Sequence, residues 1–261
     1  MKTIIIGLTG ASSSGKSTIA CILSTILPNC QIIHEDDFFK PESDVPYDES
    51  RKDRDWDCPD AIDFVKLKHT IRTLKEPSQY DSTIESIVAD SGNGYYDYVL
   101  KSTEPPRNDA NFQNDETVIL KAKKSVSEIL DSKYKNNYRI ILLDGFLLLH
   151  DEELLELFDF TLFFKTNYQS LKDRREKRHY TVGESLWVDP PGYFDQFVWP
   201  GYYIYHKDRF TNDDENVVKL TGGVLKSDFK DKYKVFEFSN QDNCDANRLI
   251  QDVISVVTEE L

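Results

Sequence analysis

The sequence lacks any apolar run long enough to span a membrane, and it is poor in positive charge. Its 32 lysines and arginines stand against 46 aspartates and glutamates, which gives a formal net charge of −14 at pH 7. A protein with this charge repels the phosphates of nucleic acids and of anionic lipids. We therefore expect no nucleic acid and no membrane among its partners, and no feature of the sequence implies a protein partner.

Cysteine is also scarce, with four in the chain, Cys21, Cys30, Cys58 and Cys244. No two of them have the C-x-x-C spacing of a zinc site and no pair of histidines lies near them, so we expect no zinc centre. Scattered thiols of this kind are typical of proteins in a reducing compartment. The sequence therefore predicts a cytoplasmic protein and leaves an additional nuclear location open.

The most informative segment is the place where an apolar strand over residues 3–9 meets a loop that contains two glycines. The loop reads Gly10-Ala11-Ser12-Ser13-Ser14-Gly15-Lys16-Ser17 and matches the phosphate-binding pattern G-x-x-x-x-G-K-[ST]. Its glycines let backbone N–H groups point at phosphate oxygens, Lys16 reaches the β- and γ-phosphates, and the Ser17 hydroxyl coordinates Mg²⁺. The helical pattern from Thr18 onward adds the positive end of a helix. We predict that this loop binds a nucleoside triphosphate with Mg²⁺.

Strand and helix patterns alternate along the chain, which predicts an α/β fold with a parallel sheet flanked by helices. Five strands are expected, over residues 3–9, 31–34, 138–143, 158–164 and 233–238, with a last helix from about Asp245. Another helix is expected from apolar residues at helical spacing, Ile119, Ala122, Val126, Ile129 and Leu130. Two polar stretches, at about 76–116 and 211–232, are interpreted as surface inserts in a single P-loop domain spanning 1–261.

Acidic residues follow two of the expected strands, at the sheet edge where open α/β sheets bind ligands. Asp36 and Asp37 come after the second strand, and Asp144 comes after the third. A kinase needs one carboxylate beside the hydroxyl that it phosphorylates and others near Ser17 to hold the metal. Asp36 or Asp37 fits the first role and Asp144 the second. Spacing alone does not choose between Asp36 and Asp37.

A cationic cluster stands out in this acidic chain, in the run Arg174-Arg175-Glu176-Lys177-Arg178. Arg174 and Arg178 are four residues apart and share one helix face, while Arg175 points elsewhere. Two guanidinium groups on one face can clamp a migrating phosphoryl group and leave a third for the acceptor. The alternative interpretation is a solvated helix face, which is what most charge runs are.

Further runs complete a family resemblance. They are residues 33–41, the pair Trp56-Asp57, residues 143–146, Tyr180 after the arginine cluster, and residues 189–195. Together with the loop, these runs resemble the nicotinamide riboside kinases, and most of all their fungal members. The resemblance implies a P-loop kinase domain related to uridine kinases, with an arginine-bearing lid. It also implies ATP-dependent phosphorylation of the ribose 5′-hydroxyl of nicotinamide riboside for NAD synthesis, and it leaves nicotinic acid riboside open as a second acceptor.

The resemblance also implies roles for individual residues. It makes Asp36 the general base and a member of the Mg²⁺ site with Ser17 and Asp144, and it makes Lys16 catalytic. The residues that it places at ATP are Gly10 to Thr18 with the lid arginines Arg174 and Arg178. The residues that it places at the acceptor are Asp36, Asp37, Phe38, Phe39, Trp56, Asp57, Arg175 and Tyr180. Among these, Asp57 and Arg175 match positions that hold the ribose 2′- and 3′-hydroxyls. Trp56 stands where some members have tyrosine, and Asp144 where some have glutamate.

The chemistry of this acceptor agrees with the aromatic positions. The pyridinium of nicotinamide riboside is cationic, and the faces of Trp56 and Tyr180 attract cations, whereas a neutral uracil gains only stacking. Residues 241–243, after the last strand, are the expected contact for the adenine of ATP. Two alternatives stay open at this point, a uridine or other nucleoside kinase of the same fold, and an NTPase switch that has no acceptor.

Overall fold

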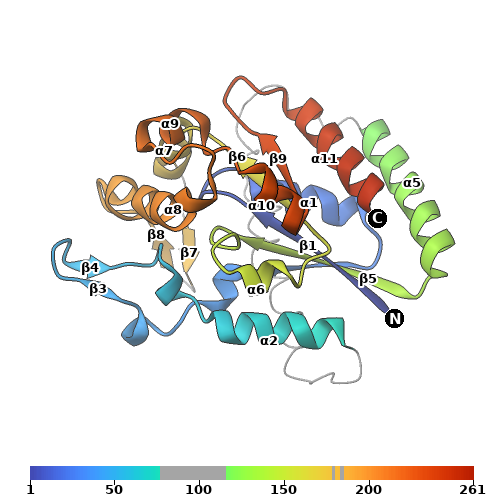
Figure 1. The fold of residues 1–261 in the computed structure, drawn as a ribbon, viewed down its shortest axis with the longest axis horizontal. Coiled ribbons are helices and arrows are strands. Elements are labelled where there is room, and N and C mark those ends of the chain that lie inside the picture. The colour runs from blue at the N-terminus through green and yellow to red at the C-terminus, as the bar shows by residue number, and fades with distance from the viewer. Residues whose placement is uncertain (77–115, 178–179, 183–184) are drawn as a thin grey trace.

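The computed structural model describes residues 1–76, 116–177, 180–182 and 185–261, and Figure 1 shows its central sheet with helices on both sides. Five parallel strands pair in the order β2-β5-β1-β6-β9. They are β1 (Lys2–Thr9), β2 (Cys30–His34), β5 (Tyr138–Gly145), β6 (Phe160–Lys165) and β9 (Val235–Ser239). The predicted parallel five-stranded sheet is confirmed, with strand ends that differ by about one or two residues from those expected.

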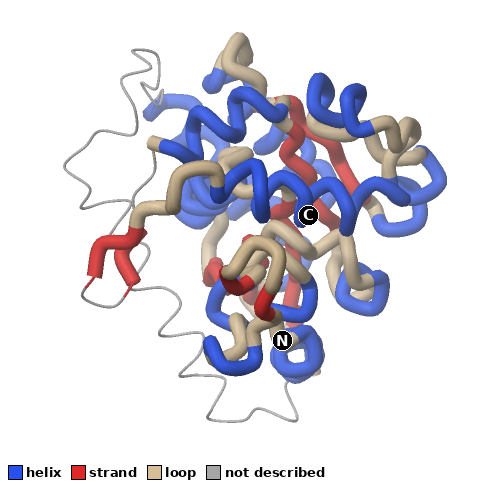
Figure 2. The backbone as a smooth tube through the Cα atoms, turned by 90° about the vertical axis from the view of Figure 1, so that its left-hand side faces the viewer, coloured by secondary structure: helices blue, strands red, loops and turns tan. Residues whose placement is uncertain are grey.

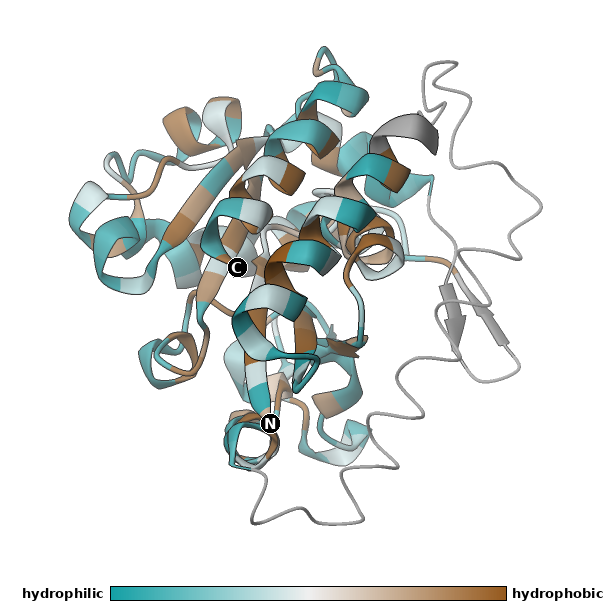
Figure 3. Cartoon of the chain, turned by 90° about the vertical axis from the view of Figure 1, so that its right-hand side faces the viewer, coloured by the Kyte–Doolittle hydropathy of each residue, from teal (hydrophilic) through white to brown (hydrophobic). Residues whose placement is uncertain are grey.

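The strands place their side chains alternately in two apolar cores, one on each face of the sheet. In β1, Ile4, Ile6 and Leu8 belong to one core, while Ile5 belongs to the other. Figure 3 shows hydrophobic residues concentrated on the strands and on the sides of the helices that meet them. Burial on both faces explains why the strands read as nearly continuous apolar runs in the sequence.

One face of the sheet is covered by α1 (Lys16–Ile26), α5 (Glu116–Tyr134) and α11 (Ala246–Glu260). The helix α5 confirms the prediction from apolar spacing, because Ala122, Val126 and Leu130 are buried. The helix α11 begins after Asp245, whose side chain accepts hydrogen bonds from the first turn. Such a cap satisfies backbone N–H groups that the start of a helix leaves unpaired.

The core on the opposite face is completed by a second group of helices. They are α2 (Phe64–Lys75), α6 (Glu152–Leu155), α7 (Tyr168–Glu176), α8 (Trp199–His206), α9 (Glu215–Thr221) and α10 (Ser227–Tyr233). The last two lie almost entirely in the stretch 211–232, whose polarity suggests a surface insert. Its apolar residues Val218, Leu225 and Phe229 are buried, so this stretch packs into the core. Nearly all of the other expected insert, residues 77–115, lies outside the described residues.

Short elements connect the main ones. They are the 3₁₀ turns η1 (Glu35–Phe38), η2 (Glu42–Asp44), η3 (Pro59–Ala61) and η6 (Lys207–Arg209), the π-helical turn η5 (Phe194–Val198), and the ribbons β3 (Tyr47–Asp48) with β4 (Asp53–Arg54) and β7 (Tyr180–Val182) with β8 (Ser185–Trp187). Figure 2 shows the β7–β8 ribbon standing apart from the central sheet. Across the described part of the chain, the search for a helix that is both long and apolar enough to cross a membrane finds none.

Candidate active site

The loop between β1 and α1 has the backbone conformation that phosphate binding requires. Its φ angles are positive at Gly10 (146°), Ser13 (68°) and Gly15 (93°), which curls the chain around the end of the strand. The helix α1 starts at Lys16, and its N-cap residue Gly15 makes no side-chain cap, so N–H groups at this helix end are available to an anion. The φ of 93° at Gly15 is one that L side chains rarely adopt, and a Cβ atom there would also displace Nδ2 of Asn240, 2.4 Å away, from its hydrogen bond to Ser14.

Several buried hydroxyl groups in and next to this loop have no hydrogen-bond partner among the described residues. They are those of Thr9, Ser13 and Ser14. The side chain of Lys16 is largely buried at the start of α1. Buried polar groups are costly when unpaired, so this arrangement is best satisfied by a polyanion such as a triphosphate.

Asp144 lies at the carboxyl end of β5, next to the loop. It pairs in register with His34 of β2, and the two side chains meet with Nδ1 of His34 3.2 Å from Oδ2 of Asp144. Burial raises the pKa of Asp144, but hydrogen bonds from His34 and Ser17 and the charge of Lys16 outweigh burial and hold this pKa below its usual value. Its second oxygen, Oδ1, is buried without a protein partner in the described part of the chain. This oxygen is therefore available to a cation.

The structure distinguishes the two aspartates that spacing does not separate. The side chain of Asp37 accepts a hydrogen bond from the backbone N–H of His34 at 3.3 Å and so closes the turn η1. The side chain of Asp36 is exposed, and no hydrogen bond or ion pair holds its carboxylate within the described residues. Asp37 has a local structural role, whereas Asp36 is free to meet a ligand.

Glu35 is a buried carboxylate to which the sequence alone assigns no role. Its Oε2 accepts hydrogen bonds from the backbone N–H groups of Phe146 at 2.7 Å and Leu147 at 3.0 Å. Burial raises the pKa of Glu35 to about 8, although these two bonds and the charge of Lys16 lower it. Glu35 thus ties the turn that carries Asp36 to the turn after β5. Its partners lie more than a hundred residues later in the sequence, so no local signal reveals this contact.

Aromatic side chains pack together at the residues that the resemblance assigns to the acceptor, and they form one wall there. The ring centroids of Phe39 and Trp56 are 5.4 Å apart in an edge-to-face arrangement, and those of Phe39 and Phe146 are 6.3 Å apart. Phe38, predicted with Phe39 to lie at the substrate, is 1% exposed and packs in the core. Of these two phenylalanines, Phe39 is the one whose ring joins the aromatic wall.

Asp57 follows this wall and is itself buried. Burial raises its pKa to about 6, even though the nearby charge of Arg175 lowers it. The hydroxyl of Tyr193 donates a hydrogen bond to Oδ2 of Asp57 at 3.3 Å. A Cβ atom on Gly201 would lie only 2.1 Å from the carbonyl oxygen of Asp57, so α8 packs directly on this part of the chain.

Arg175 connects the acceptor side to the phosphate-binding loop. It donates to the two carboxylate oxygens of Asp189, from Nε at 2.6 Å and from Nη2 at 3.3 Å. Its Nη1 donates to the hydroxyl oxygen of Ser12 at 2.7 Å. The run over 189–195 contributes to the family resemblance, but the sequence alone assigns no role to Asp189 or Tyr193. Their roles follow from two contacts in the structure, that of Asp189 with Arg175 and that of Tyr193 with Asp57.

Arg174 lies on the same helix but points to the loop after β9. Its Nη2 donates to the carbonyl oxygen of Asn240 at 3.1 Å and to Asp242 at 2.9 Å. The side chain of Asn240 in turn donates to the carbonyl oxygen of Ser14 at 2.7 Å. The loop over 241–243, expected to contact adenine, therefore lies beside the phosphate-binding loop. The predicted lid arginine Arg178 lies outside the described residues, as does the side chain of Tyr180.

The donor set fits a magnesium ion that is shared with a nucleotide. Ser17 contacts Asp144, and the buried Oδ1 of Asp144 has no partner among the described residues. The exposed Asp36 follows His34, the partner of Asp144, by two residues. Within residues 1–76, 116–177, 180–182 and 185–261, no group of three or more His, Cys, Asp or Glu side chains forms a cage for a metal. Mg²⁺ is commonly held by one or two carboxylates together with substrate phosphates, so these few ligands suit it.

Comparison with known proteins identifies a matching family and several similar enzymes that share one name. Residues 5–178 match the model of the phosphoribulokinase/uridine kinase family. A nicotinamide riboside kinase of Saccharomyces cerevisiae is 31% identical over 93% of this chain and 90% of its own length. The enzymes of that name from Schizosaccharomyces pombe and Eremothecium gossypii are each 30% identical, over 86% and 81% of this chain and 86% and 79% of their own lengths.

Proposed function

The chain belongs to the phosphoribulokinase/uridine kinase family, and we propose that it is an ATP-dependent kinase of nicotinamide riboside. It transfers the γ-phosphoryl group of ATP to the ribose 5′-hydroxyl and forms nicotinamide mononucleotide, a step in NAD synthesis. The observation that carries this proposal is the position of Arg175, which bonds Ser12 of the phosphate-binding loop and Asp189 of the acceptor side. One guanidinium thus brings a donor loop and an acceptor wall into one site.

On the donor side, the loop and the N-terminus of α1 bind the triphosphate through backbone N–H groups. Lys16 neutralises charge on the β- and γ-phosphates, and Mg²⁺ supplies further charge neutralisation when it is held by Ser17, Asp144 and Asp36. Arg174 and Arg178 stabilise the charge that spreads over the migrating phosphoryl group. For Arg174 this role requires that its guanidinium leaves Asp242 when ATP binds.

Asp36 is the proposed general base. Its exposed carboxylate lies on the turn η1, fixed beneath by Glu35 and closed by Asp37. It orients the 5′-hydroxyl in line with the γ-phosphate and accepts the proton as the new O–P bond forms. A rigid turn under Asp36 suits this role because small displacements of a catalytic group are costly.

On the acceptor side, the face of Trp56 and the ring of Tyr180 attract the cationic pyridinium. Asp57 and Arg175 bind the ribose 2′- and 3′-hydroxyls. The buried carboxylate of Asp57 accepts hydrogen bonds, and its pKa of about 6 leaves it mostly ionised at pH 7. The site therefore recognises both the positive charge of the pyridinium and the 2′,3′-diol of the ribose.

We also propose that the protein works in the cytoplasm on these two small molecules. All four cysteines, Cys21, Cys30, Cys58 and Cys244, are free thiols, as a reducing compartment favours. The net charge of −14 suits a cationic nucleoside better than a polyanionic partner. Detection of the native protein in fractionated cells tests the location.

The test of the proposed function is an assay of purified protein with ATP, Mg²⁺ and nicotinamide riboside. We expect the mononucleotide as product, and in Asp36→Ala a fall in kcat of roughly 10²-fold or more with the Kd for ATP retained. Asp37→Ala is the matched control, because this neighbouring carboxylate closes the turn. Transfer that is unchanged in Asp36→Ala would refute the assigned base, and the absence of mononucleotide in the wild type would refute the function.

A further inference from the structure

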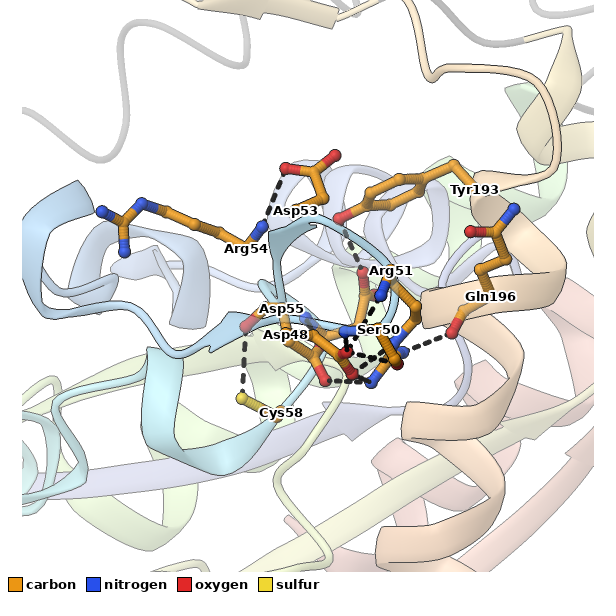
Figure 4. A network of polar contacts seen from close by, with 10 residues as sticks. Asp48, Ser50, Arg51, Asp53, Arg54, Asp55, Cys58, Tyr193 and Gln196 are labelled. Carbon is orange, nitrogen blue, oxygen red and sulfur yellow. Dashed lines mark hydrogen bonds and ion pairs between the residues drawn. The ribbon is translucent and has the colours of Figure 1, made fainter.

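A second arginine, Arg51, contacts two segments of the chain next to the residues assigned to the acceptor. It lies between the strands β3 and β4 of the short ribbon that leads to Trp56. Figure 4 shows its guanidinium between the carboxylates of Asp48 and Asp55 on one side and the turn η5 on the other. Its Nε donates to Asp48 at 2.6 Å, and its Nη2 lies 3.5 Å from Oδ2 of Asp55. Its Nη1 donates to the backbone carbonyl oxygen of Gln196.

The same guanidinium also stacks on an aromatic ring of η5. Its carbon Cζ lies 4.2 Å from the ring centroid of Phe197, a distance at which a cation is attracted to the face of the ring. The ring of Phe197 is itself stacked on Tyr193, with centroids 4.9 Å apart. Arg51 therefore contacts η5 through both a backbone carbonyl and an aromatic side chain.

Two of the contacts of Arg51 lead to Asp57, one through Asp55 and one through Phe197 and the Tyr193 ring stacked on it. Asp55 accepts a hydrogen bond from the backbone N–H of Asp57 at 3.1 Å. On the other side, Tyr193 donates its hydroxyl to the carboxylate of Asp57 at 3.3 Å. The loop that carries Trp56 and Asp57 and the segment 193–197 are thus two walls of the acceptor site, and Arg51 joins them.

We propose that Arg51 is a positioning residue that sets the separation of these two walls and so the affinity for the nucleoside acceptor. This inference rests on the proposed function, because it concerns the acceptor half of the same site. A planar guanidinium can donate to two carboxylates and a carbonyl while it stacks on a ring, which the point charge of lysine cannot do. Within the described part of the chain, Arg51 contacts neither the phosphate-binding loop nor Asp144, so its effect falls on the acceptor.

Arg54 provides a matched control on the same ribbon. The side chains of both arginines are 28% exposed. Arg54 donates from Nη1 to the carbonyl oxygen of Val45 at 2.6 Å, and its Nε lies 3.8 Å from Glu42. These contacts stay within residues 42–54 and do not reach η5. Replacement of Arg54 removes the same charge from the same ribbon while the link between the walls remains.

The experiment compares wild type, Arg51→Met, Arg51→Lys and Arg54→Met in steady-state assays with nicotinamide riboside and ATP. We expect Arg51→Met to raise KM for the acceptor about tenfold, with kcat and KM for ATP within about twofold of wild type. Arg51→Lys restores the charge without the planar fork, so its acceptor KM falls between the two. Arg54→Met stays within about twofold of wild type for both substrates.

Several outcomes would overturn the role of Arg51. These are an unchanged acceptor KM in Arg51→Met, an equal rise of KM for both substrates, or the same rise in Arg54→Met. If Arg51→Met does not yield folded protein, the acceptor KM of Arg51→Lys decides the matter. If wild type phosphorylates a different nucleoside, the proposed function fails, and the same comparison with that nucleoside still tests Arg51.

Discussion

The donor half of the site and the acceptor half are built in different ways. The donor half is a run of consecutive residues, 10–18, between one strand and one helix, and backbone conformation determines its shape. The proposed acceptor half brings the loop at 55–57 together with Arg175 on α7 and the segment 189–197, and Asp57 and Tyr193 in it are 136 residues apart. Side-chain contacts between charged and aromatic residues hold these pieces together.

This difference teaches where each half is sensitive to change. A site shaped by backbone conformation is sensitive at its glycines, because strain there cannot relax. A site held by side chains responds to single changes at residues that never touch the ligand. Phosphate binding needs the same geometry for any nucleoside acceptor, whereas acceptor choice depends on the assembled half.

The largest expected effect comes from the donor half, in Gly15→Ala. Alanine is strained at a φ of 93°, and its Cβ would meet Nδ2 of Asn240 at 2.4 Å. Together these effects should lower kcat/KM for ATP by roughly 10²-fold, since each tenfold corresponds to about 1.4 kcal/mol. Isothermal titration with the nucleoside alone should show an unchanged Kd for the acceptor. Weakened acceptor binding in this variant would show that the halves are not built separately.

A smaller effect is expected from the pH dependence of Asp57 in the acceptor half. Burial raises its pKa to about 6, so the carboxylate is ionised at pH 7 and mostly protonated at pH 5. Since the ionised form is the one proposed to accept the ribose hydroxyls, we expect KM for nicotinamide riboside to rise about tenfold from pH 7 to pH 5. The measurement is a pH series of acceptor KM, with Asp57→Asn as the control. A wild-type profile as flat as that of the control would remove Asp57 from the acceptor site.

Asp57 should also show that the acceptor half sacrifices stability for binding. Its pKa is raised from 3.8 to about 6 on folding, so the charge destabilises the folded state at pH values above this range. The cost is absent below pH 3.8, develops between pH 3.8 and about 6, and is complete at pH 7. Asp57→Asn should therefore raise the free energy of unfolding at pH 7 by up to about 3 kcal/mol while it weakens acceptor binding. Denaturation at pH 7 and pH 4 tests this, and a destabilised variant at pH 7 would contradict it.

The smallest effect concerns the contact between the halves. Ser12 belongs to the donor loop, but its hydroxyl accepts a hydrogen bond from Arg175 at 2.7 Å. Ser12→Ala should therefore raise KM for the acceptor about threefold and change KM for ATP less, because backbone groups bind the phosphates. Ser13→Ala is the comparison variant, because its buried hydroxyl has no partner in the described part of the chain and is assigned to the triphosphate, so its effect should fall on KM for ATP and leave KM for the acceptor unchanged. Steady-state kinetics with each substrate varied would decide, and a larger effect of Ser12→Ala on ATP than on the acceptor would contradict this assignment.

Much of the fold and the donor half could be predicted because their signals are local. The strand, loop and helix of the phosphate site are contiguous, and apolar spacing alone located α5. Spacing alone does not separate Asp36 from Asp37, and the choice of Asp36 came from the family resemblance. The structural difference between them, the cap that Asp37 makes on η1, depends on the backbone of His34. Glu35, Arg51 and Asp189 have partners about 110, 145 and 14 residues away, so no local pattern points to them.

The stretch 211–232 shows that a polar composition does not by itself identify a surface insert. It is rich in charged and polar residues, yet every few residues an apolar side chain, such as Val218, Leu225 or Phe229, enters the core. Short helices bury only one stripe, so their average composition remains polar. The spacing of apolar residues is more informative than average polarity in such segments. A helix of seven residues, however, is too short for this spacing to identify it.

The most direct test of the account is the choice of acceptor, because the donor half would look the same in a uridine kinase. Purified protein receives limiting ATP with equal concentrations of nicotinamide riboside and uridine, and the two monophosphates are quantified during the first turnovers. The attraction of Trp56 for a cationic base predicts that nicotinamide mononucleotide forms faster by at least about tenfold. Uridine monophosphate forming as fast or faster would contradict the proposed function.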